Sequence, residues 1–454
     1  MTDDKKARET CANDYYDAAR KEFVCENAEG RWVQHGEGGY KRILASRWLS
    51  KKIKEDSGDP LSQVERAMYD AVHHRTLEYS GLLAGWEKGV HTVPGVGRVL
   101  VTRGPELIKP VAGDWPNLHN FISSLLRDHP TQYSTLIGWL HVAITSLYAH
   151  KFRPGQAVAL CGPRDCGKSL LQQLLTVMFG GRMARPYQFM SGRTDFNADL
   201  FQGEHLIIED DAPSTRLDDR RNLGSKLKEI TANEGQRLHS KGRDAVILPV
   251  FWRITISCND EPENLMMLPP IDASLEDKLI IFRAQRAELP FDTTDGDGRE
   301  KTWKALTSEL PAFIAHLLAH KIDTAQTSGR FGVKSFAHPE ILKAIAELAP
   351  ESRLAEIIDH ELFATMGLAA SAWDGTTGDL ERRLVQSETV AYDARKLLTF
   401  NTAVGVYLAR LAIKHPKRYE KRHTSTNNFW TINPPETLKN DNEQETTPLY
   451  DRGV

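Results

Sequence analysis

The chain has 454 residues, of which 40% are hydrophobic and 26% charged, and its net charge is −3. This length predicts two or three domains, and the near-neutral charge excludes binding of nucleic acid through overall charge, so a polyanion site must be a local patch. Five cysteines without a C-x-x-C pair, no signal peptide and no run near the roughly 18 apolar residues of a membrane span predict a cytoplasmic protein without disulfides, zinc or a membrane partner.

Residues 1–125 are expected to form a small α+β accessory domain. Residues 13–26 are predicted to be a polar helix and residues 98–102 a strand, with Gly- and Pro-bearing turns between elements. The basic run at 46–56 is typical of a solvated face. No metal cluster or paired carboxylate that would indicate a polymerase or primase occurs here.

Residues 126–330 are expected to form an α/β domain. A helix is predicted within 135–150, and short apolar runs predict strands that alternate with helical segments. This pattern predicts an α/β sheet with mixed neighbours. The predicted strands lie within 157–160, 205–211, 245–260 and 278–284.

The segment GPRDCGKS, residues 162–169, fits the phosphate-loop pattern G-x-x-x-x-G-K-[ST]. A strand before it and a helix after it would place backbone N–H groups and a helix N-terminus around a phosphate. Lys168 is expected to reach the β- and γ-phosphates of ATP, and the Ser169 hydroxyl is expected to bind Mg²⁺. The residues expected to contact the nucleotide are Gly162, Pro163, Arg164, Asp165, Cys166, Gly167, Lys168 and Ser169.

Two later strand ends carry polar residues that would complete such a site. Glu209 and Asp210 follow the apolar run 206–208, and we assign Glu209 to Mg²⁺ and Asp210 to the attacking water. Asn259 follows another apolar run and could hydrogen-bond both the γ-phosphate and that water. Without the phosphate loop, these residues would be ordinary strand exits and turn residues.

Residues 235–249 are predicted to form a β-hairpin with His239, Lys241 and Arg243 at its tip. A basic tip could grip a nucleic-acid backbone. The alternative is a solvated surface hairpin, which is the more common role of such a segment.

The order GPRDCGKS, LIIEDD, LHSKGRD and ITISCND within residues 162–260 resembles the superfamily 3 helicases of viruses, phages and plasmids. The similarity is closest to the phage and plasmid primase-helicases that are related to the poxviral primase-helicase. It covers about 80–433 and is specific in 155–285. The resemblance implies an AAA+-type P-loop ATPase that assembles as a ring, usually a hexamer, and translocates on single-stranded DNA in a bacterial host cell. It also implies that His239 and Lys241 line the ring channel and contact DNA without sequence preference.

One position departs from this family. Its members often carry an arginine pair before the strand that follows the asparagine motif, and one arginine of the pair senses the neighbouring subunit's nucleotide. This chain has Glu-Asp-Lys-Leu there, at 276–279. The residues that could substitute are Lys278, Arg283, Arg286, Arg220 and Arg221.

Residues 331–433 are expected to be mainly helical, and residues 434–454 are expected to be a disordered tail. The basic segment 409–423 is read as part of a helix, and a strand is predicted to follow it at 427–433. It indicates either a winged-helix DNA-binding module, which family members often carry there, or a solvated helix end. The candidate phosphate contacts are Lys414, Lys417, Arg418, Lys421 and Arg422.

Three functions follow from these patterns. The first is an ATP-dependent DNA helicase of a phage, prophage or plasmid that acts on single-stranded and forked DNA, with a separate primase or replication proteins as partners. The second is a DNA-bound ATPase switch or loader that does not unwind DNA, which the missing arginine pair favours. The third is a P-loop phosphotransferase, which would leave the basic hairpin unexplained.

Overall fold

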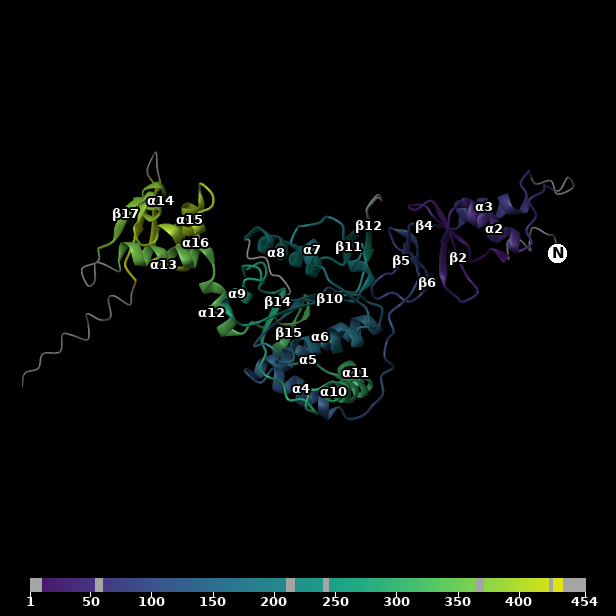
Figure 1. Cartoon of the computed structure of the whole chain (residues 1–454), viewed down its shortest axis with the longest axis horizontal. Coiled ribbons are helices and arrows are strands. Elements are labelled where there is room, and N and C mark those ends of the chain that lie inside the picture. The colour runs from purple at the N-terminus through teal and green to yellow at the C-terminus, as the bar shows by residue number, and fades with distance from the viewer. Residues whose placement is uncertain are drawn as a thin grey trace, which may run out of the picture. The chain divides into compact units, whose positions relative to one another are not determined.

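The computed structural model describes residues 10–53, 60–209, 217–239, 245–363, 371–423 and 428–435. The chain divides into two compact units, residues 1–341 and 342–454, and each is described by itself (Figure 1). Across the described ranges, no helix is both long enough and apolar enough to cross a membrane.

The N-terminal part of the first unit contains two small sheets, with strand orders β3-β2-β1-β4 and β5-β7-β6. Helices α2 and α3 pack on the first sheet. The elements are β1 (Tyr15–Asp17), β2 (Glu22–Glu26), β3 (Trp32–His35), α2 (Glu37–Ser46), α3 (Gln63–His74), β4 (Thr76–Leu77), β5 (Tyr79–Gly81), β6 (Gly89–Val93) and β7 (Gly97–Val101). Strand β7 matches the strand predicted at 98–102.

The polar helix predicted over 13–26 is wrong, because β1 and β2 form an antiparallel pair there. Phe23 stacks on Tyr40 of α2, with ring centroids 4.3 Å apart, whereas Val24 belongs to a different apolar cluster with Leu77. Successive side chains of β2 therefore enter different cores, which is the two-residue period of a strand. The polar composition of the segment concealed this period.

A five-stranded sheet forms the centre of the first unit, with strand order β14-β8-β13-β10-β9. Every neighbouring pair is parallel, so the expectation of mixed neighbours is wrong. Strands β8, β10 and β13 are buried along their whole length, as expected for a parallel sheet that helices cover on both faces. The strands are β8 (Ala157–Cys161), β9 (Met183–Ala184), β10 (His205–Ile208), β13 (Arg253–Cys258) and β14 (Leu279–Arg283).

Helices cover this sheet. In Figure 1, α7 and α8 lie above it and α4, α5, α10 and α11 lie below it, where they share the main apolar core with β8 and β14. The helices are α4 (Pro116–Leu125), α5 (Pro130–Tyr148), α6 (Lys168–Met178), α7 (Tyr187–Met190), α8 (Leu217–Ala232), α9 (Pro262–Leu265), α10 (Gly296–Ser308), α11 (Leu310–Ala319) and α12 (Pro339–Glu347), with 3-10 turns η1 (Leu200–Gln202) and η2 (Thr324–Gln326). Two short pairs complete the unit: β11 (Gly235–Leu238) with β12 (Val246–Pro249), and β15 (Thr327–Ser328) with β16 (Gly332–Val333). The single run expected at 245–260 is thus two strands.

The second unit has its own apolar core, formed by four helices and a three-stranded antiparallel sheet of order β17-β19-β18. The helix expected across the basic segment 409–423 is too long: α16 ends at Lys414, two residues before Pro416, and residues 419–423 form β18 instead. The strand predicted at 427–433 is present as β19. Lys421 and Arg422 therefore lie on β18. The elements are α13 (Pro350–Leu362), β17 (Trp373–Thr376), α14 (Thr377–Gln386), α15 (Ala391–Leu397), α16 (Ala403–Lys414), β18 (Tyr419–His423) and β19 (Asn428–Ile432).

Candidate nucleotide-binding site

The phosphate loop joins β8 to α6 at the carboxyl edge of the central sheet. A Cβ atom on Gly162 would lie 2.3 Å from the carbonyl oxygen of Ala284, so only glycine allows this approach of the two chains. Asp165 and Gly167 adopt positive φ angles of 56° and 114° as the loop turns into the helix. The first N–H groups of α6 have no partner within the helix and are available to an anion.

Lys168, the first residue of α6, turns back into this loop. Its side chain is buried, and Nζ donates to the carbonyl oxygens of Gly162 and Pro163, each at 2.7 Å. Nζ also donates to Oδ1 of Asn259 at 3.1 Å. The two residues meet because β13 lies directly beside β8, with Cys258 opposite Cys161. The structure therefore brings together the loop lysine and the asparagine that follows β13.

Glu209 follows β10, on the far side of β13 from the phosphate loop. Its carboxylate is 2.7 Å from Nη1 of Arg185, and its side chain is 24% exposed. Arg185 follows β9, which is the neighbour of β10 in the sheet. Sequence reasoning missed this arginine, because no motif marks it and only the strand order brings it to Glu209. Asp210 lies outside the described residues.

A buried polar network beneath α6 was also missed. The His205 ring contacts Thr176 Oγ1 through Nδ1 and Thr255 Oγ1 through Nε2, each at 2.8 Å, and Gln172 Nε2 donates to Thr255 Oγ1 at 2.9 Å. Burial lowers the pKa of His205 to about 3, so the ring is neutral near pH 7. The network connects α6 to β10 and β13 and thereby holds the phosphate-loop helix against both strands.

The hairpin expected at 235–249 is present as β11 and β12, paired from Gly235–Pro249 to Leu238–Val246. His239 follows β11; its backbone N–H donates to Oδ1 of Asn197 at 2.7 Å, and its ring centroid lies 5.3 Å from that of Phe196. The structure thus places His239 at the end of the ladder, held by the loop around Asn197. Lys241 and Arg243 lie outside the described residues.

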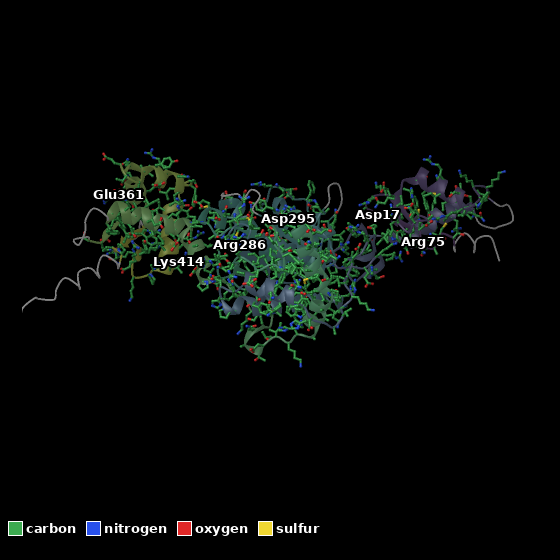
Figure 2. All side chains as sticks on the ribbon, turned by 60° about the horizontal axis from the view of Figure 1, so that its bottom comes forward. Asp17, Arg75, Arg286, Asp295, Glu361 and Lys414 are labelled. Carbon is green, nitrogen blue, oxygen red and sulfur yellow. The ribbon has the colours of Figure 1, made fainter. Side chains whose placement is uncertain are left out.

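The cations that could replace the missing arginine pair differ in their surroundings. Four of them contact groups of the same chain: Lys278 with Asp277 at 2.6 Å, Arg220 Nε with the Leu268 carbonyl at 3.0 Å, Arg221 with Asp218 at 3.8 Å, and Arg283 with Asp128 at 3.4 Å. Arg286 is exposed and lines the cleft beside the phosphate loop of its own chain. Figure 2 labels it in the central part of the chain, together with Asp295, the N-cap residue of α10.

This cleft has a volume of about 640 Å³, within the range of small-molecule sites. One wall is formed by residues 165–170 and by Gln173 on the next turn of α6. The opposite wall is formed by Arg286, Ala287, Leu289, Thr293, Arg299, Thr302 and Trp303. The phosphate loop is therefore one end of a larger ligand-sized cleft.

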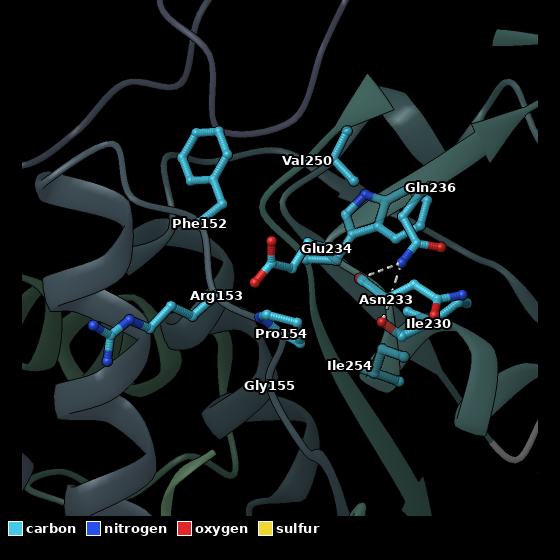
Figure 3. Close-up of a pocket in the computed structure, with 11 residues that line it drawn as sticks. Phe152, Arg153, Pro154, Gly155, Ile230, Asn233, Glu234, Gln236, Val250 and Ile254 are labelled. Atoms are coloured by element: carbon cyan, nitrogen blue, oxygen red, sulfur yellow. Dashed lines mark hydrogen bonds between the residues drawn. The ribbon is translucent and has the colours of Figure 1, made fainter. Parts of the chain in front are cut away.

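A second hollow lies near the start of β13, at the opposite edge of the sheet (Figure 3). Its volume of about 10 Å³ has room for one water molecule at most. Gln236 borders it and donates to the carbonyl oxygens of Ile230 at 3.2 Å and Asn233 at 2.9 Å. This hollow is too small for a nucleotide or another organic ligand.

A family of unknown function, DUF5906, matches residues 160–307. The apo C-terminal region of NrS-1 superimposes with a TM-score of 0.55 at 15% identity, covering 96% of this chain and 100% of that chain. The A form of that region gives 0.53 at 16% identity, with coverages of 93% and 96%. A JCV helicase structure gives 0.24 at 15% identity over 52% of this chain and 61% of that chain, which is too low to support an argument. No curated protein matches the sequence. The chain therefore shares the mixed α/β fold of the NrS-1 C-terminal region.

Proposed function

We propose that this chain is an ATP-dependent DNA helicase of a phage, prophage or plasmid replication system. The observation that carries the proposal is the hydrogen bond from Lys168 to Asn259 at the carboxyl edge of a parallel sheet. It joins the phosphate loop to the asparagine motif in one site, in the order that the resemblance to superfamily 3 helicases implies. In this proposal residues 126–330 are the ATPase domain and residues 1–125 an accessory domain.

The residues at this edge suit ATP hydrolysis. The N–H groups of the loop and of α6 would bind the phosphates, and Lys168 would balance the charge of the β- and γ-phosphates. Ser169 and Glu209 offer the oxygen ligands that Mg²⁺ prefers, and bound Mg²⁺ would neutralise further phosphate charge. Asp210 would take a proton from the water that attacks the γ-phosphorus, while the bond to ADP breaks, and Asn259 would hold this water in line.

The basic hairpin supports a DNA contact. A ring, hexameric in our proposal, would present one β11–β12 hairpin per subunit to a single strand, with Lys241 and Arg243 as cations beside His239. Repeated cations along one strand give binding without sequence preference. Forked DNA would be the substrate, and a separate primase would be a partner.

The second unit is proposed to be a winged-helix module. Its order of helix, strand, helices and two further strands, with β19 between β17 and β18, supports this assignment. Three cations of the basic segment form ion pairs within the unit. Lys414 contacts Glu351 at 3.1 Å, Arg422 contacts Asp374 at 2.5 Å, and Arg418 pairs with Asp359. Lys417 and Lys421 are exposed, and they are our candidates for phosphate contacts.

The test is strand displacement on a forked duplex with ATP and Mg²⁺, together with particle images of the protein on the fork. We expect displacement that depends on ATP, that is lost in Lys168→Ala, and that comes from a closed ring with one strand in its channel. DNA-stimulated ATP hydrolysis without displacement would instead support a DNA-bound switch or loader. That second candidate is favoured by the position of Lys278, which is buried and paired with Asp277 where the family has its arginine pair.

A further inference from the structure

The cleft beside the phosphate loop contains a buried hydroxyl without a partner. Thr302 of α10 is 2% exposed, and its Oγ1 accepts and donates no hydrogen bond among the described residues. Thr302 lines the same cleft as Lys168 and Ser169. Buried hydroxyls are normally hydrogen-bonded, and leaving one without a partner is unfavourable. A ligand in the cleft would satisfy this hydroxyl.

The geometry of α6 indicates which part of a nucleotide reaches Thr302. The β- and γ-phosphates belong at Lys168 and Ser169, where the helix begins. The cleft continues from there past Leu170 to Gln173, one turn further along α6, and its other wall is α10 with the segment before it. The space between these two walls can therefore hold the base and ribose.

The far wall has a fixed position relative to the loop. The backbone N–H of Ala287 donates to the carbonyl oxygen of Cys166 at 3.0 Å, and Ala284 donates to Cys161 at 2.6 Å. Trp303 and Leu289 are partly buried and pack on the main core. The wall thus presents an ordered apolar surface next to the buried hydroxyl.

We propose that Trp303 and Thr302 bind the base of the nucleoside triphosphate, an inference that rests on the proposed nucleotide site. The Trp303 indole is a flat apolar surface against which an aromatic base can pack, and Thr302 Oγ1 donates to or accepts from its edge. Arg286 and Arg299 are exposed on the same wall and favour an anionic ligand. Arg286 therefore acts on the nucleotide of its own chain.

The experiment compares two ligands by calorimetry: a non-hydrolysable ATP analogue and inorganic tripolyphosphate, which lacks base and ribose. Thr302→Val should weaken binding of the analogue about 3- to 10-fold, the worth of one hydrogen bond, and leave tripolyphosphate binding unchanged. It should also raise the melting temperature of the nucleotide-free protein, because an unsatisfied buried hydroxyl is removed. Trp303→Ala should weaken only the analogue, and Trp303→Phe should restore its binding.

The matched control is Thr307→Val. Thr307 lies on the same helix outside the cleft wall, and its Oγ1 donates to the Trp303 carbonyl at 2.7 Å. This variant should bind both ligands like the wild type. Wild-type affinity for the analogue in both Thr302→Val and Trp303→Ala would overturn the base site, as would an equal loss of affinity for the analogue and for tripolyphosphate in Thr302→Val. If the wild type binds neither ligand, or Lys168→Ala binds both normally, the nucleotide site itself fails as well.

Discussion

Nζ of Lys168 donates a hydrogen bond to Oδ1 of Asn259, 3.1 Å away and 91 residues later in the chain. Asn259 directly follows β13, and Lys168 ends the loop that follows the adjacent parallel strand β8. The lysine also donates to two loop carbonyls, so its charge is satisfied by groups that a γ-phosphate would replace. This contact connects the loop that would bind phosphate with the side chain that would hold the attacking water.

The first prediction concerns these two residues. Lys168→Ala should reduce ATP hydrolysis by orders of magnitude, because the charge that would balance the γ-phosphate is lost. Asn259→Ala should lower kcat about 100-fold with a smaller change in nucleotide affinity, as expected for a group that acts on the attacking water. Phosphate release as a function of ATP concentration measures kcat and KM for both variants, with circular dichroism to verify folding. Near-normal turnover of Lys168→Ala would rule out this site.

The second prediction concerns the ion pair of Arg185 with Glu209. Arg185 Nη1 lies 2.7 Å from the carboxylate that we assign to Mg²⁺, so the metal must compete with a cation for it. Arg185→Ala should lower the Mg²⁺ concentration for half-maximal ATP hydrolysis several-fold, Arg185→Lys should have a smaller effect, and Glu209→Gln should raise it. Loss of hydrolysis in Arg185→Ala at every Mg²⁺ concentration would show instead that the arginine takes part in catalysis.

The third prediction is a pH dependence of stability. Burial lowers the pKa of His205 to about 3, so below pH 6.5 the unfolded chain binds a proton that the folded chain does not. The contribution of this residue therefore lowers stability as the pH falls from 6.5 toward 3, by about 1.4 kcal/mol per pH unit. Between pH 7 and pH 5, the free energy of unfolding of His205→Gln should fall by about 2 kcal/mol less than that of the wild type, as measured by urea unfolding. The matched control is His119→Gln, at an exposed histidine of α4, measured in the same way.

The fourth prediction separates two kinds of cation in the second unit. Lys414 contacts the buried Glu351, so Lys414→Ala should destabilise the unit by about 0.5–1 kcal/mol and leave DNA affinity unchanged. Lys417 is exposed, and Lys417→Ala should weaken duplex binding and reduce the slope of log K against log salt by about 0.9. Thermal unfolding and salt titrations of both variants test this contrast. Equal DNA affinity of Lys417→Ala and the wild type would show that the segment is a solvated helix end and not a DNA-binding module.

The fifth prediction concerns the hairpin. In the proposed ring, Lys241→Ala would remove one cation per subunit from the path of the DNA strand. Stimulation by single-stranded DNA and unwinding of a fork should then both be lost, while basal ATP hydrolysis stays within a few-fold of normal. Lys41→Ala removes an exposed lysine of α2, which pairs with Glu37, and should have no such effect. If Lys241→Ala unwinds a fork like the wild type, the hairpin is a surface turn.

The sequence by itself determined the features that depend on neighbouring residues. The phosphate loop was predictable at 162–169 because its glycines, its lysine and the flanking strand and helix are contiguous. The hairpin at 235–249 was predictable for the same reason, since a Gly-containing turn stands directly before a short apolar run. The strand pair β1–β2, in contrast, was not predictable from residues 13–26. Their composition is polar, and an alternation of buried side chains over the five residues of β2 is a weak signal beside many charged side chains.

Only the tertiary structure decided which of these pieces meet. The strand order places β13 between β8 and β10, and this order brings Asn259 to Lys168 and Arg185 to Glu209. Thr302 is a further example, because its buried hydroxyl belongs to the wall of a cleft. The opposite wall of that cleft contains a loop more than a hundred residues earlier in the chain. The physical reason is that hydrogen bonds and ion pairs act over a few ångströms. Residues far apart in the chain therefore become partners only when the order and direction of the strands have placed them at one edge.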